Sequence, residues 1–125
     1  MTGMDRRTIT VQLMSGPHDG LLLRLNLDKG HETAWVIGRS DACDIALPYD
    51  PQVSRTHARL VCTTNDETMA DALDDQQATQ VRFRLIDANS RNGTYLGNRK
   101  LRNEGVDLEP GQLFRVGRTW LRIEP

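Results

Sequence analysis

Hydrophobic and polar residues alternate with a period of two along much of the chain. Residues 9–13 follow this pattern, and residues 21–27 repeat it with a leucine at every other position. Such alternation is typical of β-strands that bury one face. Residues 15–20, between these two stretches, are rich in turn-forming residues, which predicts a hairpin of two antiparallel strands.

Shorter stretches of the same kind continue to the C-terminus. Further strands are expected at residues 33–37, 45–47, 57–62, 81–85, 95–96, 99–101, 113–116 and 119–123. Gly97-Asn98 separates two of these strands and is a two-residue hairpin signal. Many short strands with Gly- and Pro-containing turns between them predict an all-β fold, a two-sheet antiparallel β-sandwich.

The length of 125 residues suits a single domain. We assign residues 1–8 to an N-terminal tail and residues 9–125 to the domain. Residues 63–80 lack the alternation. They carry five acids and no lysine or arginine. Residues 64–77 have a helical option, but we interpret the whole of 63–80 as an acidic loop inserted into the domain.

The composition is that of a globular protein, with 38% hydrophobic and 26% charged residues. No run approaches the roughly 18 consecutive apolar residues of a membrane helix, and the N-terminal residues do not form a secretory signal. We therefore expect a cytoplasmic protein that does not bind a membrane. The net charge of −1 is the sum of an acidic loop and a mildly basic remainder of the chain. The positive charge of that remainder is too small for a general nucleic-acid binder.

The cysteines and histidines give no sign of a metal site. Cys43 and Cys62 share no metal-binding or redox spacing, so reduced thiols are expected, with a disulfide as the alternative. His18, His31 and His57 are scattered along the chain. We therefore expect neither a zinc site nor a cofactor.

Three polar clusters lie at the ends of predicted strands. They are residues 38–40 (Gly-Arg-Ser), residues 53–57 (Val-Ser-Arg-Thr-His) and residues 90–94 (Ser-Arg-Asn-Gly-Thr). Each combines cationic or polar side chains with turn-forming neighbours. Because loops at one end of a sandwich can converge on a rigid scaffold, we expect the three clusters to form one site.

The side chains in these clusters suit a phosphate group attached to a peptide. Arg39, Arg55 and Arg91 carry guanidinium groups that can bind two phosphate oxygens at once, and Ser54 adds a hydroxyl donor. Asn92 can hydrogen-bond both the N–H and the C=O of a peptide backbone. The sequence therefore predicts a phosphopeptide as the ligand.

In order and spacing, these segments resemble the signature of the forkhead-associated (FHA) domain. The matching segments are Ile37-Gly38-Arg39-Ser40, Asp44-Ile45, residues 53–57 and residues 90–94, and the resemblance covers roughly residues 9–123. It implies a sandwich of about eleven strands that binds phosphothreonine peptides through loops at one end. The partners would be phosphothreonine-containing proteins and, indirectly, the Ser/Thr kinases that phosphorylate them.

The resemblance also assigns roles to single residues. Arg39 and Ser54 would hold the phosphate, and Asn92 would bond the peptide backbone next to the phosphothreonine. Arg55 and Arg91 occupy positions where family members often add a phosphate contact. The residues that would support the site structurally are Gly38, His57, Gly93 and Thr94, and His57 would brace the loop that carries Ser54.

The family hairpin often reads Asn-Gly, whereas Gly97-Asn98 stands here. A pair with glycine first suits a type II′ turn, so the fold is expected to tolerate this difference. Because Gly97 stands at the first turn position, the resemblance does not imply the contacts that an asparagine side chain would make there.

Two other functions fit parts of the sequence. Ser54, His57 and an acid such as Asp44 suggest a hydrolase, but no Gly-x-Ser-x-Gly nucleophile elbow is present, so we expect no enzyme. A phospho-independent assembly module on the same fold is the remaining alternative. Such a module would have no need of the Arg39, Ser54 and Asn92 set, and a phosphothreonine peptide compared with its unphosphorylated form separates the two functions.

Overall fold

The computed structural model describes residues 8–27, 32–64, 81–102 and 104–125. These residues form eleven strands and no helix, so the all-β prediction is confirmed. The strands are β1 (Thr8–Leu13), β2 (Leu22–Asn26), β3 (Glu32–Gly38), β4 (Ile45–Ala46), β5 (Ala58–Thr64), β6 (Val81–Asp87), β7 (Thr94–Leu96), β8 (Arg99–Lys100), β9 (Val106–Leu108), β10 (Phe114–Val116) and β11 (Thr119–Ile123). Accordingly, no helix that could cross a membrane occurs in this part of the chain.

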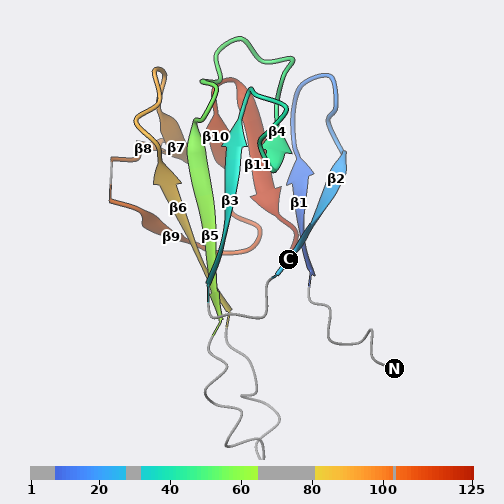
Figure 1. The fold of residues 1–125 in the computed structure, drawn as a ribbon, viewed down its shortest axis with the longest axis vertical. Coiled ribbons are helices and arrows are strands. Elements are labelled where there is room, and N and C mark those ends of the chain that lie inside the picture. The colour runs from blue at the N-terminus through green and yellow to red at the C-terminus, as the bar shows by residue number, and fades with distance from the viewer. Residues whose placement is uncertain (1–7, 28–31, 65–80, 103) are drawn as a thin grey trace, which may run out of the picture.

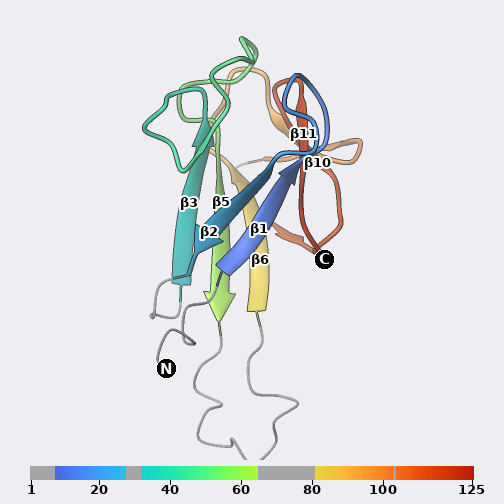
Figure 2. The same ribbon diagram turned by 90° about the vertical axis from the view of Figure 1, so that its right-hand side faces the viewer.

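The strands form two sheets that pack face to face (Figure 1). One sheet has six strands in the order β2-β1-β11-β10-β7-β8, and the other has five in the order β4-β3-β5-β6-β9. In Figure 2, β1 and β2 run obliquely across the direction of β3, β5 and β6. An angle of this kind arises from the twist of the two sheets in a sandwich, and the predicted two-sheet architecture is confirmed.

One strand pair differs from the antiparallel arrangement predicted for the sandwich. β4 runs parallel to β3, with Ile37 opposite Ile45 and Gly38 opposite Ala46. The other pairs are antiparallel. Alternation of hydrophobic residues indicates which face of a strand is buried, but it contains no information on the direction of the neighbouring strand.

Both hairpins expected from the sequence are present. β1 pairs with β2 from Thr8 opposite Asn26 onwards, so β1 begins one residue inside the predicted tail. Gly97-Asn98 connects β7 to β8, and Gly97 has a φ of 59°. A positive φ at the first turn position is the geometry that a type II′ turn requires and that glycine adopts without strain.

Two further differences concern the five-stranded sheet. The sequence pattern does not predict β9, because three residues with a single buried leucine, Leu108, give no measurable alternation. β5 extends to Thr64, so residues 63 and 64 belong to the sheet and not to the acidic loop. The rest of that loop, with its helical option, lies outside the described residues.

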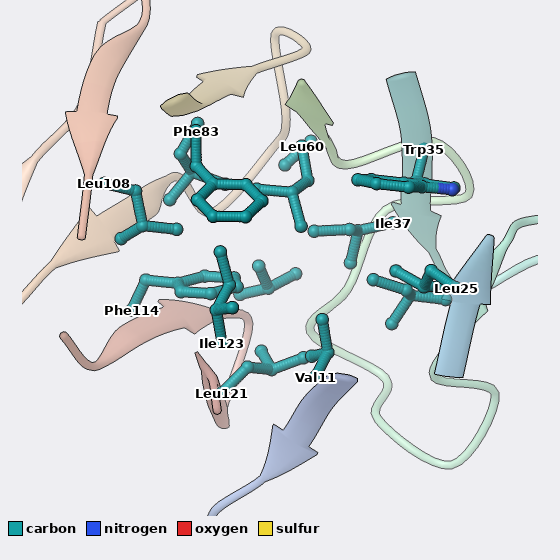
Figure 3. Close-up of a cluster of buried hydrophobic side chains, with 14 of the residues drawn as sticks. Val11, Leu25, Trp35, Ile37, Leu60, Phe83, Leu108, Phe114, Leu121 and Ile123 are labelled. Atoms are coloured by element: carbon teal, nitrogen blue, oxygen red, sulfur yellow. The ribbon is translucent and has the colours of Figure 1, made fainter. Parts of the chain in front are cut away.

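The core lies between the sheets and takes side chains from both (Figure 3). Trp35, Leu60 and Phe83 come from the five-stranded sheet, whereas Phe114 and Leu121 come from the six-stranded sheet. All five are buried, and burying one such side chain completely contributes about 1.5–3 kcal/mol. The core therefore fixes β3, β5 and β6, whose ends carry the three polar clusters.

Candidate functional site

The three clusters lie in loops at one end of the sandwich, which is the upper end in Figure 1. The loops are residues 39–44 between β3 and β4, residues 47–57 between β4 and β5, and residues 88–93 between β6 and β7. Ser54 is the link between them. Its carbonyl oxygen accepts a hydrogen bond from the Arg39 amide at 2.9 Å, and its Oγ accepts one from the Arg91 amide at 3.1 Å.

Arg39 is exposed and lies against the β4–β5 loop. Its Nε donates to the carbonyl oxygen of Val53 at 3.0 Å, which places the guanidinium group beside the residue that precedes Ser54. Within the described ranges, the two terminal nitrogens of Arg39 have no hydrogen-bond partner and no carboxylate. These nitrogens are therefore available for two oxygens of an anionic ligand.

The Ser54 hydroxyl is oriented by the β6–β7 loop. The side chain is half-buried, and one lone pair of Oγ is used by the Arg91 amide. The hydroxyl hydrogen has no acceptor among the described residues. A hydroxyl in this position can donate to a ligand while the backbone holds its oxygen in place.

His57 is completely buried and joins two of the loops. Its Nδ1 accepts a hydrogen bond from the Ser54 amide at 3.0 Å, and its Nε2 lies 2.9 Å from the carbonyl oxygen of Gly93. Because an amide must donate and a carbonyl must accept, the ring is neutral and carries its proton on Nε2. The ring therefore sets the distance between the β4–β5 and β6–β7 loops.

The same contacts leave Ser54 without a catalytic partner in this part of the chain. His57 Nδ1 bonds the backbone of Ser54 and not its hydroxyl, and Asp44 accepts a hydrogen bond from the Val36 amide at 2.8 Å. A serine nucleophile needs a base within hydrogen-bond reach of its hydroxyl. In the described ranges no group of three or more His, Cys, Asp or Glu side chains could hold a metal ion.

Gly38 occupies a position with no room for a side chain. A Cβ atom built there would lie 2.0 Å from the carbonyl oxygen of Arg55 and 2.9 Å from Cys43 Sγ. The absence of a side chain lets β3 approach the loop of Ser54 closely, where Ser40 N–H donates to the same Arg55 oxygen at 3.4 Å. Glycine is the usual residue where another backbone segment approaches this closely.

Asp87, at the end of β6, organises the β6–β7 loop and was not among the residues that the sequence indicated. Its Oδ1 accepts hydrogen bonds from the hydroxyls of Ser90 and Thr94, at 2.5 and 2.7 Å, and its Oδ2 accepts one from the Ser90 amide. Ser90 Oγ in turn accepts from the Gly93 amide at 2.9 Å. Partial burial on its own would raise the pKa of Asp87, but the hydrogen bonds from Ser90 and Thr94 outweigh it and lower this pKa below 3.8.

Asp50 performs the corresponding task for the β4–β5 loop and is also a residue that the sequence did not indicate. Only 3% of it is exposed. Its Oδ1 accepts from the Gln52 amide at 3.0 Å, and its Oδ2 accepts from the Arg118 amide at 2.8 Å and the Thr119 hydroxyl at 2.7 Å. Asp50 therefore ties the loop of Ser54 to the turn between β10 and β11.

The remaining predicted residues lie at the exposed rim of the site. Asn92 is exposed, and its Nδ2 donates to the carbonyl oxygen of Gln52 at 2.8 Å, which bridges the β6–β7 and β4–β5 loops. Arg55 and Arg91 are exposed, and their guanidinium groups have no partner within the described ranges. Gly93 has a φ of 89°, which explains a glycine directly after Asn92.

One cysteine lies in a loop of the site and the other in the core. Both are free thiols; Cys43 is half-buried beside the site and Cys62 is buried. Cys43 Sγ donates to the Arg55 carbonyl oxygen at 3.3 Å. Burial is the largest influence on the Cys43 thiol and raises its pKa. A hydrogen bond with the Ser40 backbone lowers this pKa, and the charges of Asp44 and Asp41 raise it, so the net direction is upward.

The comparisons with known proteins agree with this geometry. The family model described as the FHA domain matches residues 35–117. This chain belongs to the FHA domain family. Among curated protein sequences, none matches the chain.

Several solved structures share the fold. The FHA domain of the CT664 protein from Chlamydia trachomatis is 20% identical, with a TM-score of 0.68 over 95% of this chain and 98% of that chain. A domain solved in a study of phosphothreonine-dependent FHA domain interactions is 26% identical, with a TM-score of 0.60 over 95% and 97%. The FhaA FHA domain, complexed with the intracellular domain of Rv3910, is 27% identical, with a TM-score of 0.59 over 93% and 99%.

Proposed function

We propose that this FHA domain binds phosphothreonine-containing segments of partner proteins and catalyses no reaction. The observation that carries the proposal is the coupling of Arg39 to Ser54. Two hydrogen bonds, from the Arg39 amide to the Ser54 carbonyl oxygen and from Arg39 Nε to the Val53 carbonyl oxygen, hold the Arg39 side chain against the loop that carries the Ser54 hydroxyl. Within the described ranges, the two terminal guanidinium nitrogens and the hydroxyl hydrogen have no partner. This is a donor arrangement suited to a phosphate group.

A phosphate would receive charge-assisted hydrogen bonds in this position. A phosphothreonine brings about −1.5 to −2 charges and three strong acceptor oxygens. Arg39 would supply two donors and Ser54 one, and the exposed guanidinium groups of Arg55 and Arg91 would add positive charge at the rim. Hydrogen bonds to charged groups contribute about 1.5–3 kcal/mol each, so the phosphate would dominate the affinity.

Asn92 would hold the peptide backbone next to the phosphothreonine. Its Nδ2 is already engaged with Gln52, and its Oδ1 has no partner in the described ranges. The carbonyl oxygen would therefore accept a peptide N–H, and the second hydrogen on Nδ2 would donate to a peptide carbonyl. The Gln52 contact would pre-orient the side chain and reduce the conformational entropy lost on binding.

Two relatives support a protein ligand, and one of them supports a phosphothreonine-dependent one. The domain that is 26% identical comes from work on phosphothreonine-dependent FHA domain interactions, and the FhaA domain was solved in complex with part of another protein. For this chain we propose partners phosphorylated by Ser/Thr kinases in the cytoplasm. The free thiols Cys43 and Cys62 fit a reducing compartment. We also propose that the binding domain comprises residues 9–125, together with Thr8 of β1.

Substitutions in the Arg39–Ser54 pair test the proposal. Arg39→Ala and Ser54→Ala should each weaken binding of a phosphothreonine peptide by at least about tenfold, since each removes charge-assisted hydrogen bonds. Circular dichroism should show both variants folded, because both side chains lie in loops outside the core. Arg24→Ala removes an equally exposed arginine from β2 and should bind as the wild type does. Unchanged affinity in Arg39→Ala would contradict the proposal.

A further inference from the structure

A basic cavity lies next to the Asn92-Gly93 segment. β8 is the last strand of the six-stranded sheet and β9 the last of the five-stranded sheet, and the connection between them runs along the open side of the sandwich. Described residues of β8 and of this connection line an open cavity of about 320 Å³, and the lining includes Arg99, Lys100, Arg102 and Glu104. With three cations against one carboxylate, the lining has an excess of positive charge.

The described residues leave the cations of this cavity without an ion-pair partner. Within the described ranges, Arg99, Lys100 and Arg102 form no ion pair with a carboxylate, and all three side chains are exposed. A fourth cation reaches the same connection, because a Cβ atom at Gly105 would lie 3.3 Å from Arg84 Nη2. Unpaired cations around a concave surface attract an anionic group.

Lys100 joins this cavity to the proposed phosphothreonine site. A Cβ atom at Gly93 would lie 2.8 Å from Lys100 Cε, so the aliphatic part of the lysine packs where Gly93 has no side chain. Gly93 directly follows Asn92, and Lys100 also lines the cavity. Lys100 pairs with Tyr95 across β7 and β8, which fixes its backbone. The cavity therefore begins where the loop of Asn92 ends.

We infer that the cavity lined by Arg99, Lys100 and Arg102 is an auxiliary anion subsite, which binds a second acidic side chain of the same phosphothreonine peptide. The inference rests on the proposed function, because Asn92 would hold the peptide backbone at the entrance of the cavity. A carboxylate and a phosphate share the chemistry that these cations recognise. The preferred ligand would thus be a segment with an acidic or phosphorylated residue near its phosphothreonine.

Isothermal titration with three sets of peptides tests the subsite. The first is a phosphothreonine peptide with neutral flanks. Each peptide of the second set carries one glutamate, and each peptide of the third set carries one phosphoserine. This residue is placed in turn at each of about four positions on either side of the phosphothreonine. Because a residue spans at most about 3.3–3.6 Å, these positions cover the neighbouring surface. The proteins are the wild type, a double variant with Arg99→Ala and Arg102→Ala, and the matched control Arg24→Ala.

At one or more positions, the second anion should tighten binding to the wild type by about two- to fivefold, the upper part of the range for one exposed ion pair. This gain should disappear in the double variant, which should still bind the neutral-flank peptide, and it should persist in Arg24→Ala. A gain with phosphoserine alone would assign the subsite to phosphate, and a gain with both would assign it to either anion.

Two results would overturn the inference while leaving the proposed function intact. One is binding of the neutral-flank peptide without any gain from a second anion. The other is a gain that survives the double variant, because the second anion would then bind elsewhere. Failure of the wild type to bind any of the phosphothreonine peptides would instead contradict the proposed function and this inference with it.

Discussion

The backbone amide of Ser54 donates a hydrogen bond of 3.0 Å to Nδ1 of the buried His57 ring. Through Nε2 the same ring contacts the carbonyl oxygen of Gly93 at 2.9 Å. One side chain therefore connects the loop that carries the Ser54 hydroxyl, which we propose binds phosphate, with the loop that carries Asn92. The arrangement links the stability of the loops to the geometry of the site.

His57→Ala should lower both stability and affinity. It leaves the Ser54 amide and the Gly93 carbonyl without their partner, which predicts a loss of about 2–4 kcal/mol in the free energy of unfolding. Urea unfolding and titration with a phosphothreonine peptide measure the two effects. Thr56→Ala, at the exposed neighbouring position, is the control and should change neither. Wild-type affinity in a destabilised His57→Ala would show that the ring does not position the site.

Asp87→Asn should destabilise the β6–β7 loop in a way that depends on pH. Asparagine keeps one acceptor oxygen but replaces the other by a donor, so at neutral pH we predict a loss of about 1–3 kcal/mol. The folded pKa of Asp87 lies below its ordinary value of 3.8, so its contribution is complete above that value and disappears as the pH falls through the folded pKa.

Urea unfolding of the wild type and Asp87→Asn between about pH 7 and about pH 2 measures this dependence. The difference between the two proteins should stay constant in the neutral range and shrink at the acidic end. Asp19→Asn, at an exposed position, should match the wild type throughout. A difference that stays constant to the lowest pH would show that the charge on Asp87 does not stabilise the loop.

Gly38→Ala should be more destabilising than a substitution that introduces only backbone strain. The new Cβ would lie 2.0 Å from the Arg55 carbonyl oxygen, and moving that backbone predicts a loss of about 3 kcal/mol or more. Gly20→Ala is the comparison, because Gly20 has a φ of 95° with no atom within 4 Å of the built Cβ. Its expected loss is about 1–2 kcal/mol. Equal melting temperatures for the two variants would contradict the clash at Gly38.

A phosphothreonine peptide should bind more tightly than its phosphoserine counterpart. The two ligands carry the same charge, so Arg39 and Ser54 do not distinguish them, and one methyl group is the difference. Burying a methyl contributes about 0.8 kcal/mol, and more where a fitted pocket would otherwise be empty, so we expect a preference between about fourfold and a hundredfold. Titration with matched peptides measures it. Equal affinities would mean that this domain does not recognise the methyl group.

Much of the fold follows from the sequence, because alternating residues bury one face of each longer strand. The β1–β2 and β7–β8 hairpins are examples where turn residues and alternation agree. β9 and the parallel β3–β4 pair are not predictable in this way. Three residues give no period, and strand direction depends on partners that are distant in the sequence.

The sequence indicated the residues that we propose face the ligand, and the family resemblance indicated four supporting residues, but neither indicated Asp50 and Asp87. Arg39, Ser54 and Asn92 combine donor chemistry with turn-forming neighbours, which is visible in the sequence. Asp50 and Asp87 also adjoin turn-forming residues, so their sequence context indicates ordinary turns. Their function as acceptors depends on partners from other loops, such as Arg118 for Asp50, 68 residues away. The position of Asp87 before a serine and a threonine was the only local signal for it.

Isothermal titration of the wild-type domain with one peptide in two forms, phosphorylated and unphosphorylated on its threonine, tests the central claim most directly. The peptide would be selected from a degenerate phosphothreonine library. We expect micromolar affinity for the phosphorylated form and binding weaker by well over tenfold for the other, since the phosphate would accept charge-assisted hydrogen bonds from Arg39 and Ser54. Equal affinity for the two forms would contradict phosphothreonine recognition and favour phospho-independent assembly.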